Sequence, residues 1–192
     1  MNIVIFGPPG AGKGTQSKFI AEKYNLFQLS TGELLRNEIN NNTELGSKIS
    51  SIINSGELVS DNIVSSLITK FISNNAYKQR LIFDGYPRNI NQAENLDRLL
   101  KKNDQKVDIV LKLSVSLETI LKRILERKNQ EKRKDDNKEI AIKRYKTYEK
   151  STEPVLEYYQ KSKLLNVVNG ESSIVEISDE ISGLIERIKG WQ

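Results

Sequence analysis

A glycine-rich loop near the start of the chain has the composition and spacing of a phosphate-binding site. Residues 7–13 follow the pattern G-x-x-x-x-G-K, with Gly10 inside it and Thr15 two places after Lys13. Glycines let successive backbone N–H groups converge on one anion, because no Cβ blocks the approach. A helix beginning near Lys13 would add free N–H groups and the positive end of its dipole, and the lysine would add a charge for the outer phosphates. The loop therefore predicts a site for a phosphate chain.

The overall composition restricts which chemistry can accompany that site. Lys and Arg number 30 against 25 Asp and Glu, a formal net charge of +5, and the 192 residues include neither cysteine nor histidine. This excludes disulfides, thiolate nucleophiles, imidazole bases and zinc held by thiolates or imidazoles. Lys, Arg, Asp, backbone amides and a hard metal ion remain. The positive charge indicates anionic partners, without distinguishing nucleic acid, membrane surfaces and small phosphates.

Alternating strands and helices are predicted to position the loop. Short runs rich in Ile, Val, Leu and Phe predict strands buried on both faces of a parallel sheet. These runs are residues 2–6, 81–84, 107–113 and 164–168, with a weaker candidate at 27–30. Apolar residues spaced three and four apart predict a helix over 117–125 and another near the C-terminus, with Ser178 and Asp179 as candidate caps of the latter. The alternation indicates βαβ units and a three-layer α/β domain.

Two stretches interrupt this alternation. Residues from about 30 to 59 hold helical patterns broken by glycine and asparagine, and they predict a helical insertion after the second strand. Residues from about 126 to 137 are almost wholly charged, which is typical of a solvated helix face or a linker. No apolar run is long enough for a signal sequence or for the roughly 20 residues of a membrane span, so we expect a cytoplasmic protein.

The loop departs from the general phosphate-binding pattern at one position. Gly14 separates Lys13 from Thr15, whereas the general pattern has Ser or Thr directly after the lysine. The sequence GKGT resembles the loop of nucleoside monophosphate kinases, which predicts a second nucleotide site elsewhere in the chain. Further segments resemble the motifs of adenylate kinase over nearly the full length: LSTGELLR at 29–36, GELV at 56–59, FDGYPRNINQAE at 83–94, RILER at 123–127, RKDDN at 133–137, the run at 143–159 and VNG at 168–170.

This resemblance, to adenylate kinases of the short-lid type, implies a fold and an activity. The fold would be a three-layer P-loop kinase fold with a central parallel five-stranded sheet, a helical AMP-binding insertion and a short lid. Residues 1–29, 60–125 and 138–192 would form the core, 30–59 the insertion and 126–137 the lid. The activity would be reversible phosphoryl transfer from MgATP to AMP, giving two ADP, by a monomer without a nucleic-acid or membrane partner. The lid, which lacks cysteine, would hold no structural zinc.

The resemblance also implies site residues, in an ATP half and an AMP half. ATP would contact Gly10, Ala11, Gly12, Lys13, Gly14, Thr15, Arg123, Arg127 and the carbonyl of Ser172. AMP would contact Thr31, Gly32, Arg36, Glu57, Leu58, Val59, Gly85, Tyr86, Pro87, Arg88, Gln92, Arg133 and Arg144. Catalysis would rest on Lys13, Arg88, Arg127, Arg133 and Arg144, with Asp135 and Asp136 orienting the lid arginines.

The residue types suit these roles. Arg36 and Arg88 are planar forks that can grip two oxygens of a monophosphate at once. Asp84 ends an apolar strand, where a carboxylate would orient hydrated Mg²⁺. The Gln92 amide can donate one hydrogen bond to an adenine edge and accept one from it. Together with Thr31 it favours AMP over UMP or CMP, whose kinases have sequences similar to SAG and an Asn at these positions.

Three other interpretations of the chain are open. A kinase for another nucleoside monophosphate, such as UMP or CMP, would keep the fold and is disfavoured by Thr31 and Gln92. A nucleic-acid-binding protein would use the basic surface, but the basic residues lack interleaved aromatics and a recognisable binding module. A nucleotide sensor without catalysis is disfavoured because the lysine and arginines of the catalytic set are all present. Glu33, where the family mostly has Asp, keeps the charge and changes its reach.

Overall fold

Five parallel strands form one sheet in the order β2-β3-β1-β4-β5. They are β1 (Ile3–Phe6), β2 (Phe27–Ser30), β3 (Leu81–Asp84), β4 (Ile109–Ser114) and β5 (Leu165–Asn169), in a computed structural model that describes residues 1–131 and 136–188. Each of the five predicted strands is present, with its ends within two residues of the predicted ones. The prediction of an α/β fold with a parallel five-stranded sheet is therefore confirmed.

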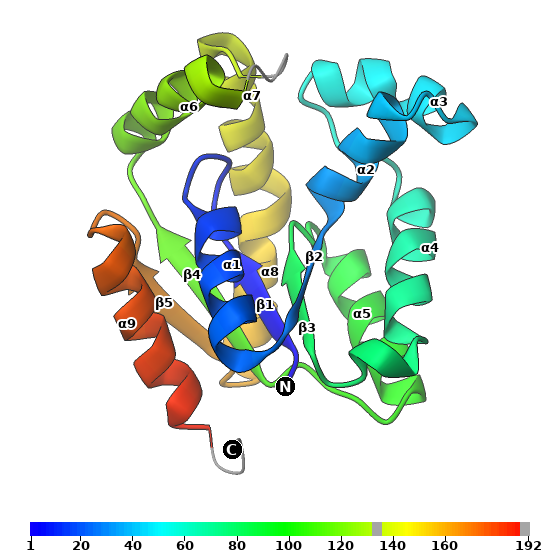
Figure 1. Ribbon diagram of the computed structural model, residues 1–192, viewed down its shortest axis with the longest axis vertical. Coiled ribbons are helices and arrows are strands. Elements are labelled where there is room, and N and C mark those ends of the chain that lie inside the picture. The colour runs from blue at the N-terminus through cyan, green and yellow to red at the C-terminus, as the bar shows by residue number, and fades with distance from the viewer. Residues whose placement is uncertain (132–135, 189–192) are drawn as a thin grey trace.

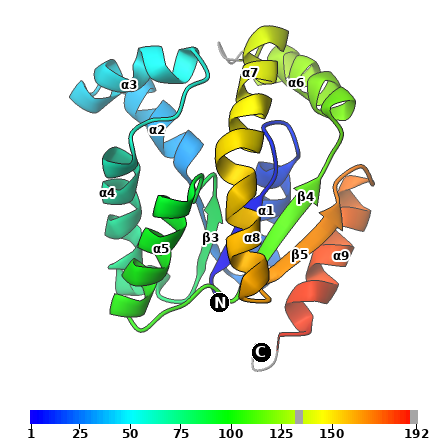
Figure 2. The same ribbon diagram turned by 180° about the vertical axis from the view of Figure 1, so that it is seen from behind.

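Helices cover both faces of the sheet, as Figures 1 and 2 show from opposite sides. One face carries α1 (Lys13–Tyr24) and α9 (Ile174–Glu186), and the other carries α4 (Asp61–Ile72), α5 (Ile90–Lys102) and α8 (Glu153–Lys161). In β1, Ile3 and Ile5 pack in the core on the α1 and α9 side, whereas Val4 and Phe6 pack in the core on the opposite side. Alternate side chains of one strand thus enter two cores, which gives the domain its three layers.

Two pairs of helices rise beyond the carboxyl ends of the strands, on either side of the loop that follows β1 (Figure 1). One pair is α2 (Thr31–Asn40) and α3 (Glu44–Asn54), and the other is α6 (Leu117–Glu131) and α7 (Lys138–Thr147). The first pair fills the stretch predicted as a helical insertion. A 3-10 turn, η1 (Asn75–Tyr77), precedes β3, and a π-helical turn, η2 (Tyr148–Thr152), joins α7 to α8.

The prediction that Ser178 and Asp179 cap the C-terminal helix is wrong. α9 begins at Ile174, and Ser173 is its N-cap. The Ser173 hydroxyl accepts a hydrogen bond from the backbone N–H of Glu176 at 3.3 Å, and the Glu176 carboxylate accepts one from the backbone N–H of Ser173 at 2.9 Å. This capping box satisfies two N–H groups at once, so the helix starts about one turn earlier than predicted.

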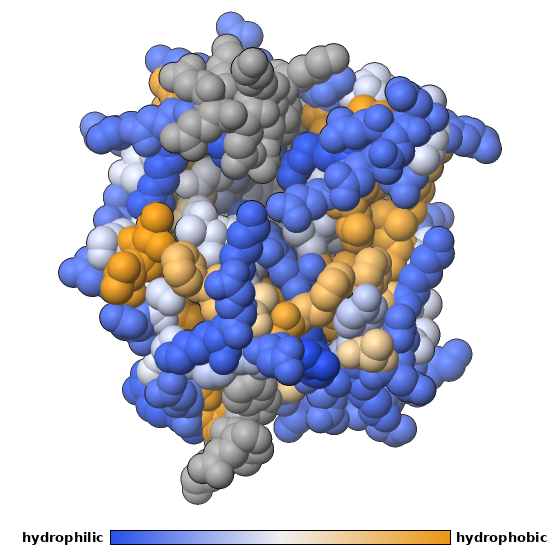
Figure 3. All heavy atoms as spheres, viewed as in Figure 1, coloured by the Kyte–Doolittle hydropathy of each residue, from blue (hydrophilic) through white to orange (hydrophobic). Residues whose placement is uncertain are grey.

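The surface is largely hydrophilic on the face shown in Figure 3, where hydrophobic atoms gather around α4 and at the first turn of α9. At that turn, Ile174 and Val175 are 52% and 66% exposed. Among residues 1–131 and 136–188, no helix is both long and apolar enough to cross a membrane.

Candidate active site

A cleft of about 910 Å³ opens at the carboxyl edge of the sheet, and both overhanging pairs of helices contribute to its walls. All nine residues of the predicted ATP half line it. Of the predicted AMP half, the cleft is lined by Thr31, Gly32, Arg36, Glu57, Leu58, Val59, Gly85, Pro87, Arg88, Gln92 and Arg144. Tyr86 is different, because its side chain is buried in the core and its hydroxyl accepts a hydrogen bond from Asn95 Nδ2 at 3.2 Å. Arg133 and Asp135 lie outside the described residues.

The loop after β1 curls back because two of its glycines adopt left-handed backbone angles. The φ angle is +87° at Gly10 and +94° at Gly12, a region that L side chains rarely adopt. A Cβ on Gly10 would also lie only 3.0 Å from Ile124 of α6. α1 then begins at Lys13. In this part of the chain, which the structure describes, the first turn of the helix has no acidic residue, and no side chain caps its N-terminus. The free N–H groups and the helix dipole are therefore available to an anion in the cleft.

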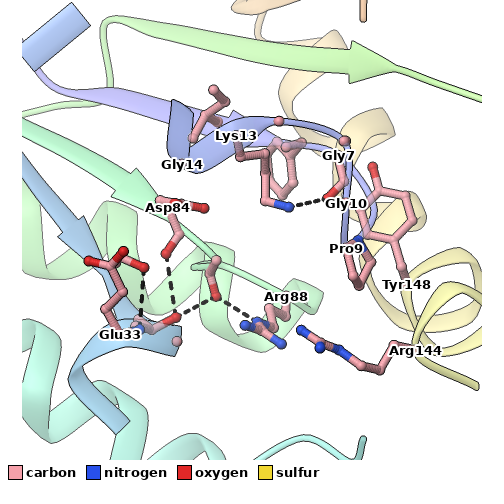
Figure 4. Close-up of a pocket in the computed structure, with 18 of the residues that line it drawn as sticks. Gly7, Pro9, Gly10, Lys13, Gly14, Glu33, Asp84, Arg88, Arg144 and Tyr148 are labelled. Atoms are coloured by element: carbon pink, nitrogen blue, oxygen red, sulfur yellow. Dashed lines mark hydrogen bonds between the residues drawn. The ribbon is translucent and has the colours of Figure 1, made fainter. Parts of the chain in front are cut away.

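Lys13 bends back over this loop (Figure 4). Its Nζ donates to the carbonyl oxygens of Gly7 at 2.6 Å and Pro8 at 3.1 Å. Burial lowers the pKa of Lys13 to about 8, with Asp84 opposing the shift and Arg88 among the nearby cations that add to it. The ammonium is therefore still mostly charged at neutral pH, and an anion in the cleft would both raise this pKa and compete with the two carbonyls for the ammonium.

Three arginines gather at the cleft from different elements: Arg36 from α2, Arg88 from the loop after β3, and Arg144 from α7. Figure 4 shows the guanidinium groups of Arg88 and Arg144 directed toward each other. Arg88 is held by the backbone, because its Nε donates to the Gly85 carbonyl at 2.7 Å and its own carbonyl accepts from Thr152 Oγ1 at 3.0 Å. Burial, and then the charge of Arg144, lowers the pKa of Arg88 to about 10. Such like charges gathered in a cleft indicate a site for a phosphate group.

Two further arginines reach the cleft from α6. Arg123 donates to the carbonyl of Gly170 at 2.9 Å and to that of Ala11 at 3.4 Å, so it joins the loop after β5 to the loop after β1. Arg127 makes a bidentate contact with Asp136, with Nε to Oδ2 at 2.7 Å and Nη2 to Oδ1 at 2.5 Å. Asp136 is fully buried. The structure thus pairs one of the two aspartates expected to orient lid arginines with Arg127.

Asp84, at the end of β3, places a carboxylate beside the loop after β1. Its Oδ2 accepts a hydrogen bond from Gln28 Nε2 at 3.1 Å, and a Cβ on Gly14 would lie 3.8 Å from the same oxygen. The Asp84 carboxylate and the hydroxyl of Thr15, which also lines the cleft, are the hard oxygen donors that Mg²⁺ prefers, so the residues present fit that ion. Sequence reasoning missed Gln28, although a polar residue inside the short run 27–30 was an available signal.

Glu33 lies on the same wall of the cleft as Asp84 in Figure 4, and it comes from the first turn of α2. Glu33 therefore adds a second carboxylate near this wall. The described part of the chain has no group of three or more His, Cys, Asp or Glu side chains placed to hold a metal ion.

The wall formed by α2, α3 and α4 combines apolar surface with a buried amide. Leu35, Ile53, Val59 and Val64 line it. Gln92, only 4% exposed, also lines the cleft, and its amide nitrogen donates to Asp61 Oδ1 at 2.6 Å while its amide oxygen accepts from the backbone N–H of Arg88 at 2.7 Å. Such a wall suits a flat base with polar groups on one edge. Sequence reasoning missed Asp61, which carried no local signal.

The loop after β5 contributes Ser172 to the lining of the cleft. The preceding residue, Glu171, accepts hydrogen bonds from the Thr119 hydroxyl at 2.6 Å and the backbone N–H of Ser116 at 2.7 Å. These bonds lower the pKa of Glu171 to about 2. They hold the loop after β5 against the start of α6.

Comparison with known proteins gives consistent matches over nearly the whole chain. The family model described as adenylate kinase matches residues 5–164. The adenylate kinase of Pelagibacter ubique (strain HTCC1062) is 43% identical, with 97% of this chain and 100% of the relative covered. The adenylate kinase of Flavobacterium psychrophilum is 40% identical, with coverage of 98% and 100%, and that of Methanothrix thermoacetophila is 37% identical, again with 98% and 100%.

Proposed function

The chain belongs to the adenylate kinase family, and from this premise we propose that its cleft transfers the γ-phosphoryl group of MgATP to AMP, reversibly, giving two ADP. One observation carries the proposal. The loop after β1 with Lys13, and the group of Arg36, Arg88 and Arg144, line one cleft, and each supplies donors and charge suited to an anion. One site would hold the donor and the other the acceptor, which a direct transfer requires.

In the donor half, the N–H groups of residues 10–15 and the ammonium of Lys13 would hold the phosphates of ATP. Arg123 and Arg127 would contact the same phosphates from α6. Arg127 is already oriented by Asp136, and Arg123 would exchange a contact with a carbonyl for one with a phosphate. The carbonyl of Ser172 would contact the adenine.

In the acceptor half, Arg36 and Arg88 would grip the phosphate of AMP, and Arg144 would contact the group in transfer. The base would lie against the apolar wall of α2, α3 and α4. Thr31, the backbone of residues 57–59 and the amide of Gln92 would read its edge.

The transfer needs no covalent enzyme intermediate. An AMP phosphate oxygen would form a bond to the γ-phosphorus as the bond from that phosphorus to the β–γ bridging oxygen breaks, and ADP would leave with the electron pair. The nucleophile is already anionic at neutral pH, so no general base is required. Lys13 and the arginines would stabilise the charge that spreads over the three equatorial oxygens. Mg²⁺ bound with ATP would neutralise phosphate charge, held by Thr15 and, through water, by Asp84.

We also propose that residues 30–59 are the AMP-binding insertion and that residues 126–137 are a lid, both closing over bound nucleotides. Closure would exclude water, which otherwise competes with AMP for the phosphoryl group. An exposed ion pair between Lys143 of α7 and Glu57, at 3.0 Å, already joins the proposed insertion to α7, the helix that follows the proposed lid. Because one chain carries both proposed sites, we propose that the enzyme acts as a monomer. We also propose that it acts in the cytoplasm.

The test is ADP formation by the purified protein with MgATP and, in parallel, AMP, CMP, UMP or dTMP. We expect turnover with AMP to exceed that with the other acceptors by about 100-fold or more. Lys13→Met serves as the inactive control, and Gln92→Leu should reduce the preference for AMP while transfer continues. Turnover with CMP or UMP but not with AMP would contradict the base assignment, and transfer to none of the acceptors would contradict the kinase itself.

A further inference from the structure

The amide of Gln92 is held at both ends by groups outside the nucleotide. Its Nε2 donates to Asp61 Oδ1 at 2.6 Å, and its Oε1 accepts from the backbone N–H of Arg88 at 2.7 Å. A carboxylate can only accept a hydrogen bond, and a backbone N–H can only donate one. A half-turn of the amide would therefore place oxygen against carboxylate and NH₂ against N–H, replacing two attractive contacts by two repulsive ones.

Asp61 is itself fixed in position. Asn89 Nδ2 donates to both carboxylate oxygens of Asp61, at 3.0 and 3.2 Å. The other side-chain atom of Asn89, Oδ1, caps α5 by accepting from the backbone N–H of Gln92 at 2.8 Å. Asp61 is also the first residue of α4, where the helix dipole favours a carboxylate. The start of α4 and the start of α5 are thus joined by a closed network around one amide.

We propose that Asp61, which does not line the cleft, determines which purine the acceptor site selects, by fixing the orientation of the Gln92 amide. The inference rests on the proposed function, in which Gln92 reads the base of the acceptor nucleotide. Asp61 acts here as a positioning residue, because its contact is with Gln92.

The chemistry of the purine edge explains the selection. After its two contacts inside the protein, the Gln92 amide keeps one N–H and one lone pair for a ligand. Adenine donates a hydrogen bond from its 6-amino group, whereas hypoxanthine and guanine present an accepting oxygen at the same position. The ribose and phosphate would fix the place of the base. An amide whose Oε1 faces the 6-position of the purine then accepts a hydrogen bond from the amino group of adenine and repels the oxygen of a 6-oxo base. An amide free to turn would serve both kinds of base.

The experiment compares AMP with IMP, which differs from AMP in this edge, as acceptors of the phosphoryl group of MgATP. In the unmodified protein we expect kcat/KM for AMP to exceed that for IMP by about 100-fold or more, the range reached when buried polar groups are left unpaired. Asp61→Asn keeps the size of the side chain but can donate as well as accept, so it removes one of the two repulsive contacts that oppose the turned amide and leaves only the one with the backbone N–H of Arg88. We expect the AMP-to-IMP ratio to fall about tenfold in this variant, chiefly through KM.

Ser65→Ala is the matched control. Ser65 lies one turn further along α4 and accepts a hydrogen bond from Asn95 Nδ2 of α5 at 2.7 Å. The substitution removes a contact between the same two helices without touching Gln92, and we expect the ratio to stay unchanged. A merely structural role for Asp61 would lower kcat/KM for both acceptors together and also leave the ratio unchanged.

The outcomes separate the two proposals. An active parent protein whose AMP-to-IMP ratio is the same in Asp61→Asn would overturn the role of Asp61 alone. A parent protein that transfers no phosphoryl group to AMP would overturn the proposed function and this inference with it. Should Asp61→Asn not fold, Asn89→Asp replaces it, because aspartate still caps α5 while its charge repels Asp61. The ratio is expected to fall in that variant too, and an unchanged ratio would again overturn the role of Asp61.

Discussion

Lys13 carries its charge where water is scarce, and its protonation has opposite effects on binding and on folding. Burial lowers its pKa in the folded protein from 10.5 to about 8. The unfolded chain therefore binds more protons between pH 8 and 10.5, so this group makes the folded state more stable as pH rises through that window. Below pH 8 the full cost of the buried charge remains. The proposed donor site requires this cost, because only the charged form attracts phosphate.

We expect kcat/KM for MgATP, measured at an AMP concentration well below its KM, to fall as pH rises through about 8. The free enzyme then loses the Lys13 charge, whereas a phosphate monoester has already ionised near pH 6. The measurement is an initial-rate profile between about pH 7 and pH 10. The fall should be absent from the residual rate of Lys13→Met, and a flat profile in the unmodified protein would contradict the role of this lysine.

Arg127 and Asp136 form a charge pair of unequal burial, with the aspartate fully buried and the arginine side chain 23% exposed. Arg127→Ala leaves a buried carboxylate without its partner, so we expect the free energy of unfolding to drop by about 3–5 kcal/mol. Urea unfolding measures the change. Lys143→Ala, which breaks the exposed pair with Glu57, is the control and should cost less than about 1 kcal/mol.

The double variant Arg127→Ala/Asp136→Ala should be more stable than Arg127→Ala alone, because no buried charge is then left unpaired. A double variant as unstable as the sum of the two single ones would show that the pair itself is not the cause.

Among the elements, the pair α2 and α3 depends on one close approach. Gly46, in the first turn of α3, lies against the end of α2, and a Cβ at this position would sit 2.1 Å from the carbonyl oxygen of Glu38. The two helices can pack at this separation only with glycine between them. Because α2 carries Thr31 and Arg36, the packing of the pair bears on the proposed acceptor site.

We expect Gly46→Ala to raise KM for AMP about tenfold while KM for ATP changes little, and to lower the free energy of unfolding by about 1–3 kcal/mol. Steady-state kinetics with each nucleotide varied in turn measures the first effect. Gly183→Ala is the matched control: Gly183 lies in α9, and a Cβ there meets nothing within 4 Å. It should leave both KM values unchanged and stabilise the helix by up to about 1 kcal/mol. An equal rise in both KM values for Gly46→Ala would contradict the assignment of this pair to AMP.

Elements with local signals could be predicted from the sequence, and contacts between distant residues could not. The strands, the loop after β1 and its helix follow from runs of adjacent residues. Gln28 and Asp61 act on partners 56 and 31 positions away, Asp84 and Gln92 respectively, and no periodicity links such pairs. Burial too could not be predicted from a motif: the segment around Tyr86 predicts a nucleotide contact, and the structure shows that its side chain turns into the core.

At the scale of the whole molecule, the sheet serves as a platform on which the two proposed anion sites, of different origin, meet. The loop after β1 comes from the centre of the sheet, whereas the arginine group is assembled from α2, the loop after β3 and α7. The cations in the cleft repel one another. Bound nucleotides should therefore stabilise the fold in two ways, through the contacts that they make and by neutralising this repulsion.

If the two sites are separate, AMP and a non-hydrolysable ATP analogue should bind together. Each ligand alone, at about 100 times its Kd, should raise the free energy of unfolding by about 2.7 kcal/mol, and the two together should raise it by at least the sum. Thermal unfolding with each ligand and with both provides the measurement. A combined effect no larger than that of one ligand would mean that they compete for one site.

Direct transfer between two nucleotides bound at once is the central claim, and it is tested by following a radioactive γ-phosphoryl group of ATP. With AMP and Mg²⁺ present, the label should appear in the β-phosphate of the ADP formed from AMP, one label for each AMP consumed, with little released as inorganic phosphate. Label released mainly as inorganic phosphate, at a rate independent of AMP, would contradict the claim, because the cleft would then transfer the group to water.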